Sequence, residues 1–212
     1  MIIYIIMFIS IGGNIGSGKS TLLAELQAEL NPALFSFLPE PVAEWTTIID
    51  EHGKNPLQYF YENPHKYAFN LQILAFITRL NLIQKAMDGE MEQIIISERS
   101  LEEDRYVFAQ KLYDSGFISG IEFATYKHWF NSQSILPDIQ IYIDTPHQIC
   151  YERILKRGRP EELPITKDYI HSLETYYNKF LSTSKTKTYV INGTKAVAIL
   201  KEEVLSILKI IT

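Results

Sequence analysis

The chain reads Gly13-Asn14-Ile15-Gly16-Ser17-Gly18-Lys19-Ser20-Thr21 close to its beginning, which fits the phosphate-binding pattern G-x-x-x-x-G-K-[ST]. An apolar run at 2–11 precedes this loop and predicts a buried strand, and a helical pattern follows from Lys19. Glycines let successive backbone N–H groups turn toward phosphate oxygens, and the N-terminus of the next helix favours the same anion. Lys19 supplies a positive charge, and the Ser20 hydroxyl is a suitable Mg²⁺ ligand. The stretch therefore predicts a nucleoside triphosphate site.

Composition is that of an ordinary globular protein. Hydrophobic residues make up 46% and charged residues 21% of the 212 residues, which favours one domain, residues 1–212, with a substantial core. The net charge is −5. Surfaces that bind nucleic-acid polymers are usually basic, so no such partner is expected.

The first residues and the cysteine content bear on the compartment. The apolar run at 1–9 has no basic segment before it and is too short to span a bilayer, so neither a targeting signal nor a membrane partner is expected. The sequence leaves open whether Met1 or Met7 is the true start. A single cysteine, Cys150, excludes an internal disulfide and is typical of a reducing compartment. We expect an intracellular, cytoplasmic protein.

Strand and helix patterns alternate along the chain. After the first strand, strands are predicted at 35–38, 94–96, 139–143 and 188–191, and helices at 19–30, 65–88, 101–114, 119–133, 146–157, 166–181 and 195–210. Gly89 predicts a helix stop, Ser119 and Glu122 predict a capping box, and Thr145 predicts a cap with Pro146 at the first helical position. The alternation predicts an α/β, P-loop NTPase-type three-layer fold: a five-stranded parallel sheet with helices on both faces.

Charged residues follow two of the predicted strands. Glu40 lies between two prolines just after the strand at 35–38, which holds it stiffly, although a plain turn explains the pattern equally well. Glu98 and Arg99 follow the strand at 94–96, at the carboxyl edge of the sheet where open α/β sheets bind ligands.

Polar residues also recur on two predicted helices. Gln72 and Arg79 are seven residues apart and share one helix face, which from periodicity alone is most often solvated surface. Arg153, Arg157 and Arg159 cluster around a helix end, where the helix dipole favours cations in any case. With Lys156 they make four cations in seven residues, more than the helix dipole alone would explain.

The histidines give no metal signal in the sequence. His52, His65, His128, His147 and His171 are scattered, and no paired ligand spacing accompanies them. A zinc site is therefore not expected.

Three clusters together resemble the deoxyribonucleoside kinases of the deoxycytidine and deoxyguanosine kinase type. They are Glu40-Pro41-Val42; Glu98-Arg99-Ser100 followed by Asp104-Arg105-Tyr106; and Arg157-Gly158-Arg159-x-Glu161-Glu162. The resemblance runs from Gly13 to about Asn192. It implies transfer of the γ-phosphoryl group of ATP, or of another nucleoside triphosphate, to the 5′-hydroxyl of a deoxyribonucleoside.

The resemblance also implies residue roles. Lys19, Glu40 and Arg99 are the expected catalytic residues, with Glu40 as general base on the 5′-hydroxyl and Arg99 on the 5′-oxygen and the transferred phosphoryl group. Ser20 and Glu98 are the expected Mg²⁺ ligands. The triphosphate is expected to contact the loop residues Gly13 to Thr21 together with Arg153, Arg157 and Arg159, the arginines of an Arg-rich lid at about 157–164. The nucleoside is expected to contact Glu40, Trp45, Tyr61, Phe69, Gln72, Arg79, Arg99, Asp104, Phe108 and Glu162.

Three of these residues bear on the choice of base. The Gln72 amide suits cytosine or adenine and, when flipped, guanine or thymine. Arg79 and Asp104 resemble the pair that excludes thymine in these kinases, so deoxycytidine and purine deoxynucleosides are expected to be preferred over thymidine. The chain departs from the family in a shorter lid after Glu162 and in the loop at 192–194, which lacks the usual acid and leaves the donor open.

Two other functions compete with this one. A nucleoside monophosphate kinase of the thymidylate type needs cations at the acceptor end, where Glu40 would repel a second phosphate. A nucleotide-dependent regulatory module is the other alternative, and the chain has no guanine-reading motif. The resemblance further implies a homodimer, with the helices at 65–88 and 120–133 as the possible interface.

Overall fold

Five parallel strands form the centre of the molecule. The computed structural model describes residues 7–88 and 93–211, and the sheet order is β2-β3-β1-β4-β5. The strands are β1 (Met7–Gly12), β2 (Phe35–Leu38), β3 (Ile94–Glu98), β4 (Ile139–Asp144) and β5 (Lys187–Asn192). Residues 2–6 of the predicted first strand and the predicted helix stop Gly89 lie outside the described residues. The predicted parallel sheet is confirmed.

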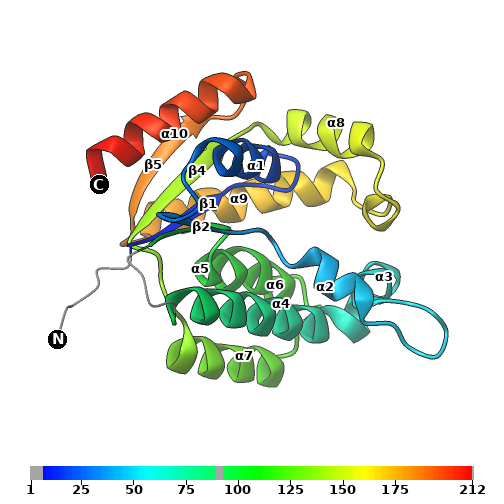
Figure 1. Ribbon diagram of the computed structural model, residues 1–212. Coiled ribbons are helices and arrows are strands. Elements are labelled where there is room, and N and C mark those ends of the chain that lie inside the picture. The colour runs from blue at the N-terminus through cyan, green and yellow to red at the C-terminus, as the bar shows by residue number, and fades with distance from the viewer. Residues whose placement is uncertain (1–6, 89–92, 212) are drawn as a thin grey trace.

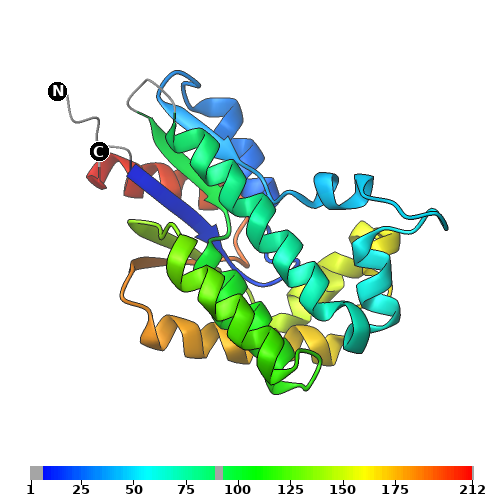
Figure 2. The same ribbon diagram turned by 90° about the horizontal axis from the view of Figure 1, so that it is seen from below.

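Helices cover both faces of this sheet, as Figure 1 shows. The helices α1 (Lys19–Glu29) and α10 (Val197–Ile211) pack together on one face. On the other face lie α4 (Pro64–Met87) and α7 (Gly120–Gln133), which cross in front of the sheet in the view from below (Figure 2). Over residues 7–88 and 93–211, no helix combines the length and apolar character needed to cross a bilayer.

Alternating side chains of β1 and β3 contribute to two separate cores. Phe8 and its register partner Ile95 are fully buried in the core formed with α4 and α7. Ile9 and Ile96, the next pair along the same two strands, are buried in the core formed with α1 and α10. Because successive strand residues point to opposite faces, an apolar run without polar interruptions is what a doubly covered sheet requires.

Two short helices were missed by the sequence prediction. They are α2 (Val42–Thr47) and α3 (Pro56–Glu62), and they extend the chain beyond the carboxyl edge of the sheet (Figure 2). α3 begins with a capping box between Asn55 and Gln58. Neither segment is long enough to show a helical period, and their prolines favoured a loop interpretation.

The segment 101–114 is helical as predicted, but it is not one regular α-helix. It consists of α5 (Leu101–Glu103), a π-helical segment η1 (Asp104–Ala109) and α6 (Gln110–Asp114). Composition carries no signal for the wider π turn, which in proteins is often found at functional sites.

The predicted Thr145 cap is also wrong, whereas the Ser119–Glu122 capping box is confirmed. The helix α8 (His147–Arg157) has Pro146 at its N-cap position. The Thr145 hydroxyl instead donates to the Ser17 carbonyl oxygen, 3.2 Å away. The Thr145 side chain therefore binds the phosphate loop and does not cap the helix, although the local sequence predicts that cap. The segment η2 (Pro160–Glu162) and the helix α9 (Lys167–Thr183) follow.

Candidate active site

The predicted phosphate loop joins β1 to α1. The backbone φ angles of Gly13, Gly16 and Gly18 are 146°, 81° and 106°, values that residues other than glycine rarely adopt. The Lys19 ammonium group folds back over the loop and donates to the carbonyl oxygens of Gly13 and Asn14 at 3.0 and 2.8 Å. Burial, helped by the charge of Arg99, lowers the pKa of Lys19 to about 8. The loop thus holds a mostly charged lysine at neutral pH.

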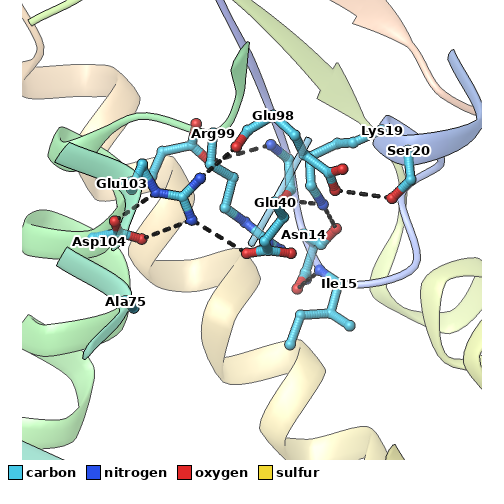
Figure 3. A network of polar contacts seen from close by, with 12 residues as sticks. Asn14, Ile15, Lys19, Ser20, Glu40, Ala75, Glu98, Arg99, Glu103 and Asp104 are labelled. Carbon is cyan, nitrogen blue, oxygen red and sulfur yellow. Dashed lines mark hydrogen bonds and ion pairs between the residues drawn. The ribbon is translucent and has the colours of Figure 1, made fainter. Parts of the chain in front are cut away.

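Two oxygen ligands meet beside this loop. The Ser20 hydroxyl donates to Glu98 Oε1 at 2.9 Å, at the point where α1 begins and β3 ends (Figure 3). Register explains the meeting, because Glu98 pairs with Ile11 at the end of the neighbouring strand. A hydroxyl and a carboxylate side by side are the hard oxygen donors that Mg²⁺ prefers, so these residues fit the metal.

Arg99 occupies a strained backbone conformation directly after β3. Its φ is +66°, the only positive value of a non-glycine residue in the described chain. The Arg99 N–H donates to the Ile11 carbonyl at 3.0 Å, and the Ser97 hydroxyl donates to the Arg99 carbonyl at 2.6 Å. Strain of this kind costs about 1–3 kcal/mol and persists only where surrounding contacts impose it. The conformation turns the guanidinium group toward Glu40.

Two arginines hold the Glu40 carboxylate. Arg99 Nη1 forms a short ion pair with Glu40 Oε1, and Figure 3 shows both residues beside the phosphate loop. Arg79 Nη2 lies 3.3 Å from the same oxygen. Burial alone would raise the pKa of Glu40, but the charges of Arg99 and Arg79 outweigh it and lower the pKa to about 2. Glu40 is therefore an ionised member of a network and not a plain turn residue.

Arg79 extends this network to Asp104. Its Nε donates to Asp104 Oδ2 at 2.7 Å and its Nη2 to Oδ1 at 3.4 Å, while Nη1 donates to the Glu98 carbonyl oxygen. Although burial opposes it, the carboxylates of Asp104 and Glu40 raise the pKa of Arg79. Arg79 and Gln72 are buried, at 3% and 7% exposure, so the helix face that they share is not solvated surface.

A cavity of about 470 Å³ adjoins both the loop and the network. The predicted residues that line it are Ile15, Gly16, Gly18, Lys19, Ser20, Thr21, Glu40, Trp45, Tyr61, Gln72, Glu98, Arg99, Asp104, Phe108, Arg153, Arg157, Arg159 and Glu162. The predicted residues that do not line it are Gly13, Asn14, Ser17, Phe69 and Arg79. Phe69 packs half-buried against the core, and Leu71 lines the cavity beside Gln72. Within the described part of the chain, the buried Gln72 Oε1 has no hydrogen-bond partner.

The arginines near the end of α8 have different partners. Arg153 Nη1 donates to the Ser17 carbonyl at 3.0 Å, and its Nη2 donates to the Gly193 carbonyl at 2.9 Å. Arg157 instead forms a two-point ion pair with Glu162, at 3.0 and 2.6 Å. Arg153 thus joins the phosphate loop to the loop at 192–194, and Arg157, the last residue of α8, binds the segment that connects α8 to α9.

Sequence analysis missed a buried hydroxyl and carboxylate under the loop. The Tyr177 hydroxyl lies 2.8 Å from both the Gly13 carbonyl oxygen and Glu103 Oε2. Arg99 Nε donates to the same hydroxyl at 3.5 Å. Burial raises the pKa of Glu103. The apolar stripe of α9 predicts that Tyr177 is a core residue, but the local sequence does not predict which groups its hydroxyl binds.

Comparisons with known proteins agree with this geometry. A family model described as deoxynucleoside kinase matches residues 9–209. Deoxycytidine kinase 2 of Gallus gallus is 34% identical over 196 residues, which cover 82% of this chain and 73% of the relative. Human deoxycytidine kinase is 31% identical over 202 residues, covering 85% and 77%.

A solved structure shares the whole fold. It is described as deoxyadenosine kinase from M. mycoides with the products dCMP and a flexible dCDP bound. The TM-score is 0.80 at 29% identity, and the match covers 96% of this chain and 99% of the other. The phosphate loop, the carboxylate–arginine network and these matches together show that the chain belongs to the deoxynucleoside kinase family and is a phosphotransferase acting on deoxynucleosides.

Proposed function

We propose that this kinase transfers the γ-phosphoryl group of ATP, or of another nucleoside triphosphate, to the 5′-hydroxyl of deoxycytidine and purine deoxynucleosides in preference to thymidine. The observation that supports it most is the ion network Glu40–Arg99–Arg79–Asp104, which runs from the phosphate loop to the Gln72 end of one cavity. The similar M. mycoides kinase is described with the products dCMP and dCDP bound, both of which are cytosine nucleotides. The whole chain, 1–212, acts as one kinase domain with a lid at 157–164.

The chemical step rests on charge and position. Glu40 accepts the 5′-hydroxyl hydrogen bond and takes its proton, while Arg99 and Lys19 hold the phosphoryl oxygens. The two arginines keep Glu40 a weak base, and its basicity rises as Arg99 moves its hydrogen bonds to the phosphoryl group. Arg153 lies beside the loop already, and Arg157 and Arg159 close over the triphosphate with the lid.

Mg²⁺ belongs between the loop and β3. Ser20 and Glu98 would hold it, and the ion would neutralise charge on the donor phosphates. The contact between these two side chains keeps both oxygens at one place before the donor arrives.

The opposite end of the cavity selects the base. The buried Gln72 Oε1 accepts a hydrogen bond from the amino group of cytosine or adenine, which satisfies an acceptor that has no partner within the described chain. Trp45 and Phe108 flank the base, and the Asp104 carboxylate, held by Arg79, also favours an amino group. Thymine O4 facing the Asp104 carboxylate would leave two acceptors unpaired, at a cost of about 1–3 kcal/mol. Phe69 as a further wall stays a prediction.

The sugar lies between α3 and the lid. Tyr61 and Glu162 both line the cavity, and α3 contacts η2, so both groups can reach the 3′-hydroxyl. Glu162 also binds Arg157, so a closed lid couples sugar recognition to the position of a triphosphate arginine.

The partner and the compartment belong to the same proposal. The chain forms a homodimer through α4 and α7, whose outer faces expose Ile77, Ile121 and Trp129. It works in a reducing, cytoplasmic compartment, consistent with the free buried Cys150.

The base preference is tested by measuring kcat/KM for the four deoxynucleosides. Wild type should use deoxycytidine and the purines at least about tenfold better than thymidine. The double variant Arg79→Met/Asp104→Ala should gain thymidine activity, because it removes a buried pair as a unit. Each single variant should do worse with every substrate, since it leaves an unpaired buried charge.

Other outcomes would overturn this assignment. A wild type that prefers thymidine refutes the base preference but leaves the kinase activity in place. Transfer to deoxynucleoside monophosphates and not to deoxynucleosides would refute the role of Glu40 at the acceptor end.

A further inference from the structure

Two histidines and a glutamate meet on the outside of α8 and α9. His147 Nδ1 lies 2.8 Å from Glu174 Oε2, and His171 Nδ1 lies 3.4 Å from the same oxygen. The two Nδ1 atoms are 3.3 Å apart. None of the three residues lines the active-site cavity. Three ligand atoms from two helices therefore surround one point.

The three atoms together are suited to bind a cation. Neutral imidazoles can each aim an Nδ1 lone pair at this point, and the carboxylate oxygen adds negative charge. Glu174 Oε2 can accept a hydrogen bond from either imidazole, whereas a divalent cation at this point would bind all three atoms at once. Ligands that surround Zn²⁺ tetrahedrally at about 2.0–2.1 Å stand about 3.3 Å from one another. The separations of 3.3 and 3.4 Å match two edges of such a tetrahedron, and the 2.8 Å between His147 Nδ1 and Glu174 Oε2 would have to widen by about 0.5 Å.

The carboxylate is also held in place by the backbone. Glu174 Oε1 accepts the N–H of His147 at 3.0 Å, in the first turn of α8, so Oε2 stays directed at the imidazoles. Outer contacts that orient a ligand in this way are typical of metal sites. His147 is only 15% exposed, while His171 is 61% exposed, which gives an ion access and leaves its fourth position to water.

We propose that His147, His171 and Glu174 bind one divalent transition-metal ion of the zinc type. Imidazole nitrogen suits Zn²⁺, Cu²⁺ and Ni²⁺, whereas Mg²⁺ prefers oxygen, so this site is distinct from that of Ser20 and Glu98. The ion joins the start of α8 to α9, the two helices connected by the segment at 158–166. It therefore stabilises their packing against each other from outside the cavity.

Metal titration of the tag-free, chelator-treated full chain tests the site. Calorimetry with Zn²⁺, in buffer containing excess Mg²⁺ and no nucleotide, should give one site per chain with a dissociation constant below about 10 µM. Co²⁺ should give the intense visible bands of tetrahedral nitrogen–oxygen coordination. The thermal midpoint should rise with Zn²⁺ and not with Mg²⁺.

Matched variants locate the ion. His171→Ala and Glu174→Gln should each weaken Zn²⁺ binding at least about tenfold, and His171 is exposed enough for its removal to leave the fold intact. His128→Ala, at another exposed helical histidine, should bind Zn²⁺ as wild type does. His52→Ala removes the histidine of the exposed cluster Asp50–Glu51–His52 and should also have no effect.

Three results would overturn the proposal. They are the absence of saturable Zn²⁺ binding, binding that survives both His171→Ala and Glu174→Gln, and binding lost in His52→Ala. In the first case the cluster is a hydrogen-bonded group that shares a proton. In the other two the ion binds elsewhere on the chain.

Discussion

Under the proposed mechanism, Glu40 meets two opposing requirements. A proton acceptor needs a basic oxygen, but Arg99 and Arg79 lower its pKa to about 2. Both demands are met if the arginines release the carboxylate only when a phosphoryl group takes their hydrogen bonds. A weakly basic carboxylate at rest also stays ionised in acid, so it keeps its charge for orienting the hydroxyl.

The Glu40→Gln substitution isolates the proton-accepting role. We expect kcat to fall roughly 10²–10⁴-fold, because the amide keeps the shape and cannot take a proton. Nucleoside affinity, measured by calorimetry, should change far less. Glu44→Gln on the exposed side of α2 is the matched control and should leave kcat unchanged. Near-normal turnover of Glu40→Gln would return this residue to a purely structural role.

The same pKa sets the acid side of the pH profile. Because the pKa of Glu40 is lowered, its carboxylate is ionised above about pH 2 and protonates only below it. In wild type, Glu40 should therefore cause no fall in kcat/KM between pH 7 and about pH 4. An acid limb that Glu40→Gln abolishes would contradict this arrangement.

At the scale of elements, the phosphate loop and α8 are interlocked. The Thr145 hydroxyl and Arg153 both bind the Ser17 carbonyl oxygen. A side-chain carbon at Gly16 would lie 2.3 Å from the Cys150 carbonyl oxygen in α8, and Gly16 has φ +81°. The close approach brings α8, with its arginines, directly against the loop.

Gly16→Ala should therefore damage both stability and phosphate binding. We expect a loss of about 1–3 kcal/mol in the free energy of unfolding from the backbone conformation alone, and weaker ATP binding in addition. Gly120→Ala is the control, since Gly120 has open space at its side-chain position and lies in the first turn of α7. Urea unfolding and nucleotide calorimetry measure both effects. Equal stability of the two variants would show that the loop adjusts freely.

The π-helical segment η1 also positions residues of the candidate site. It includes Asp104 and Phe108, both of which line the cavity. A widened turn changes the direction of side chains that an uninterrupted helix would carry around its surface. Local propensity has no means of signalling it, and the segment follows the strained residue Arg99 by five positions.

Considering the whole molecule, α4 and α7 expose large apolar side chains on their outer faces. Ile121 and Trp129 are eight residues apart on one face of α7, at 76% and 51% exposure, and Ile77 on α4 is 47% exposed. Large apolar side chains gathered on neighbouring helices are typical of a protein–protein interface. A second copy of the chain is the occupant that we propose.

Trp129→Glu should break this dimer. Sedimentation velocity should find wild type at twice the chain mass of 24.5 kDa and the variant at the chain mass itself, because a carboxylate cannot be buried against its own copy. Ile210→Glu replaces an equally apolar, 76% exposed residue on α10 and should remain dimeric. A monomeric wild type would refute the interface.

The phosphate loop, the parallel α/β architecture and the family could all be predicted from the amino-acid sequence. These depend on local features: glycine spacing, apolar periods and short charged motifs that follow strands. The strand at Phe35–Leu38 and the capping box of α7 follow the same logic, since the residues that form them are neighbours along the chain.

The partners of the buried polar groups, in contrast, could not be predicted before the folded arrangement was known. Arg79 reaches Glu40 and Asp104 across 39 and 25 residues, and Tyr177 reaches Gly13 across 164. His147 and His171, scattered in sequence, meet between two helices, and Thr145 leaves its expected helix cap for the phosphate loop. Burial removes water as a partner, so each buried polar group must bind whatever the fold brings near. That choice depends on the packing of distant elements, which local sequence does not encode.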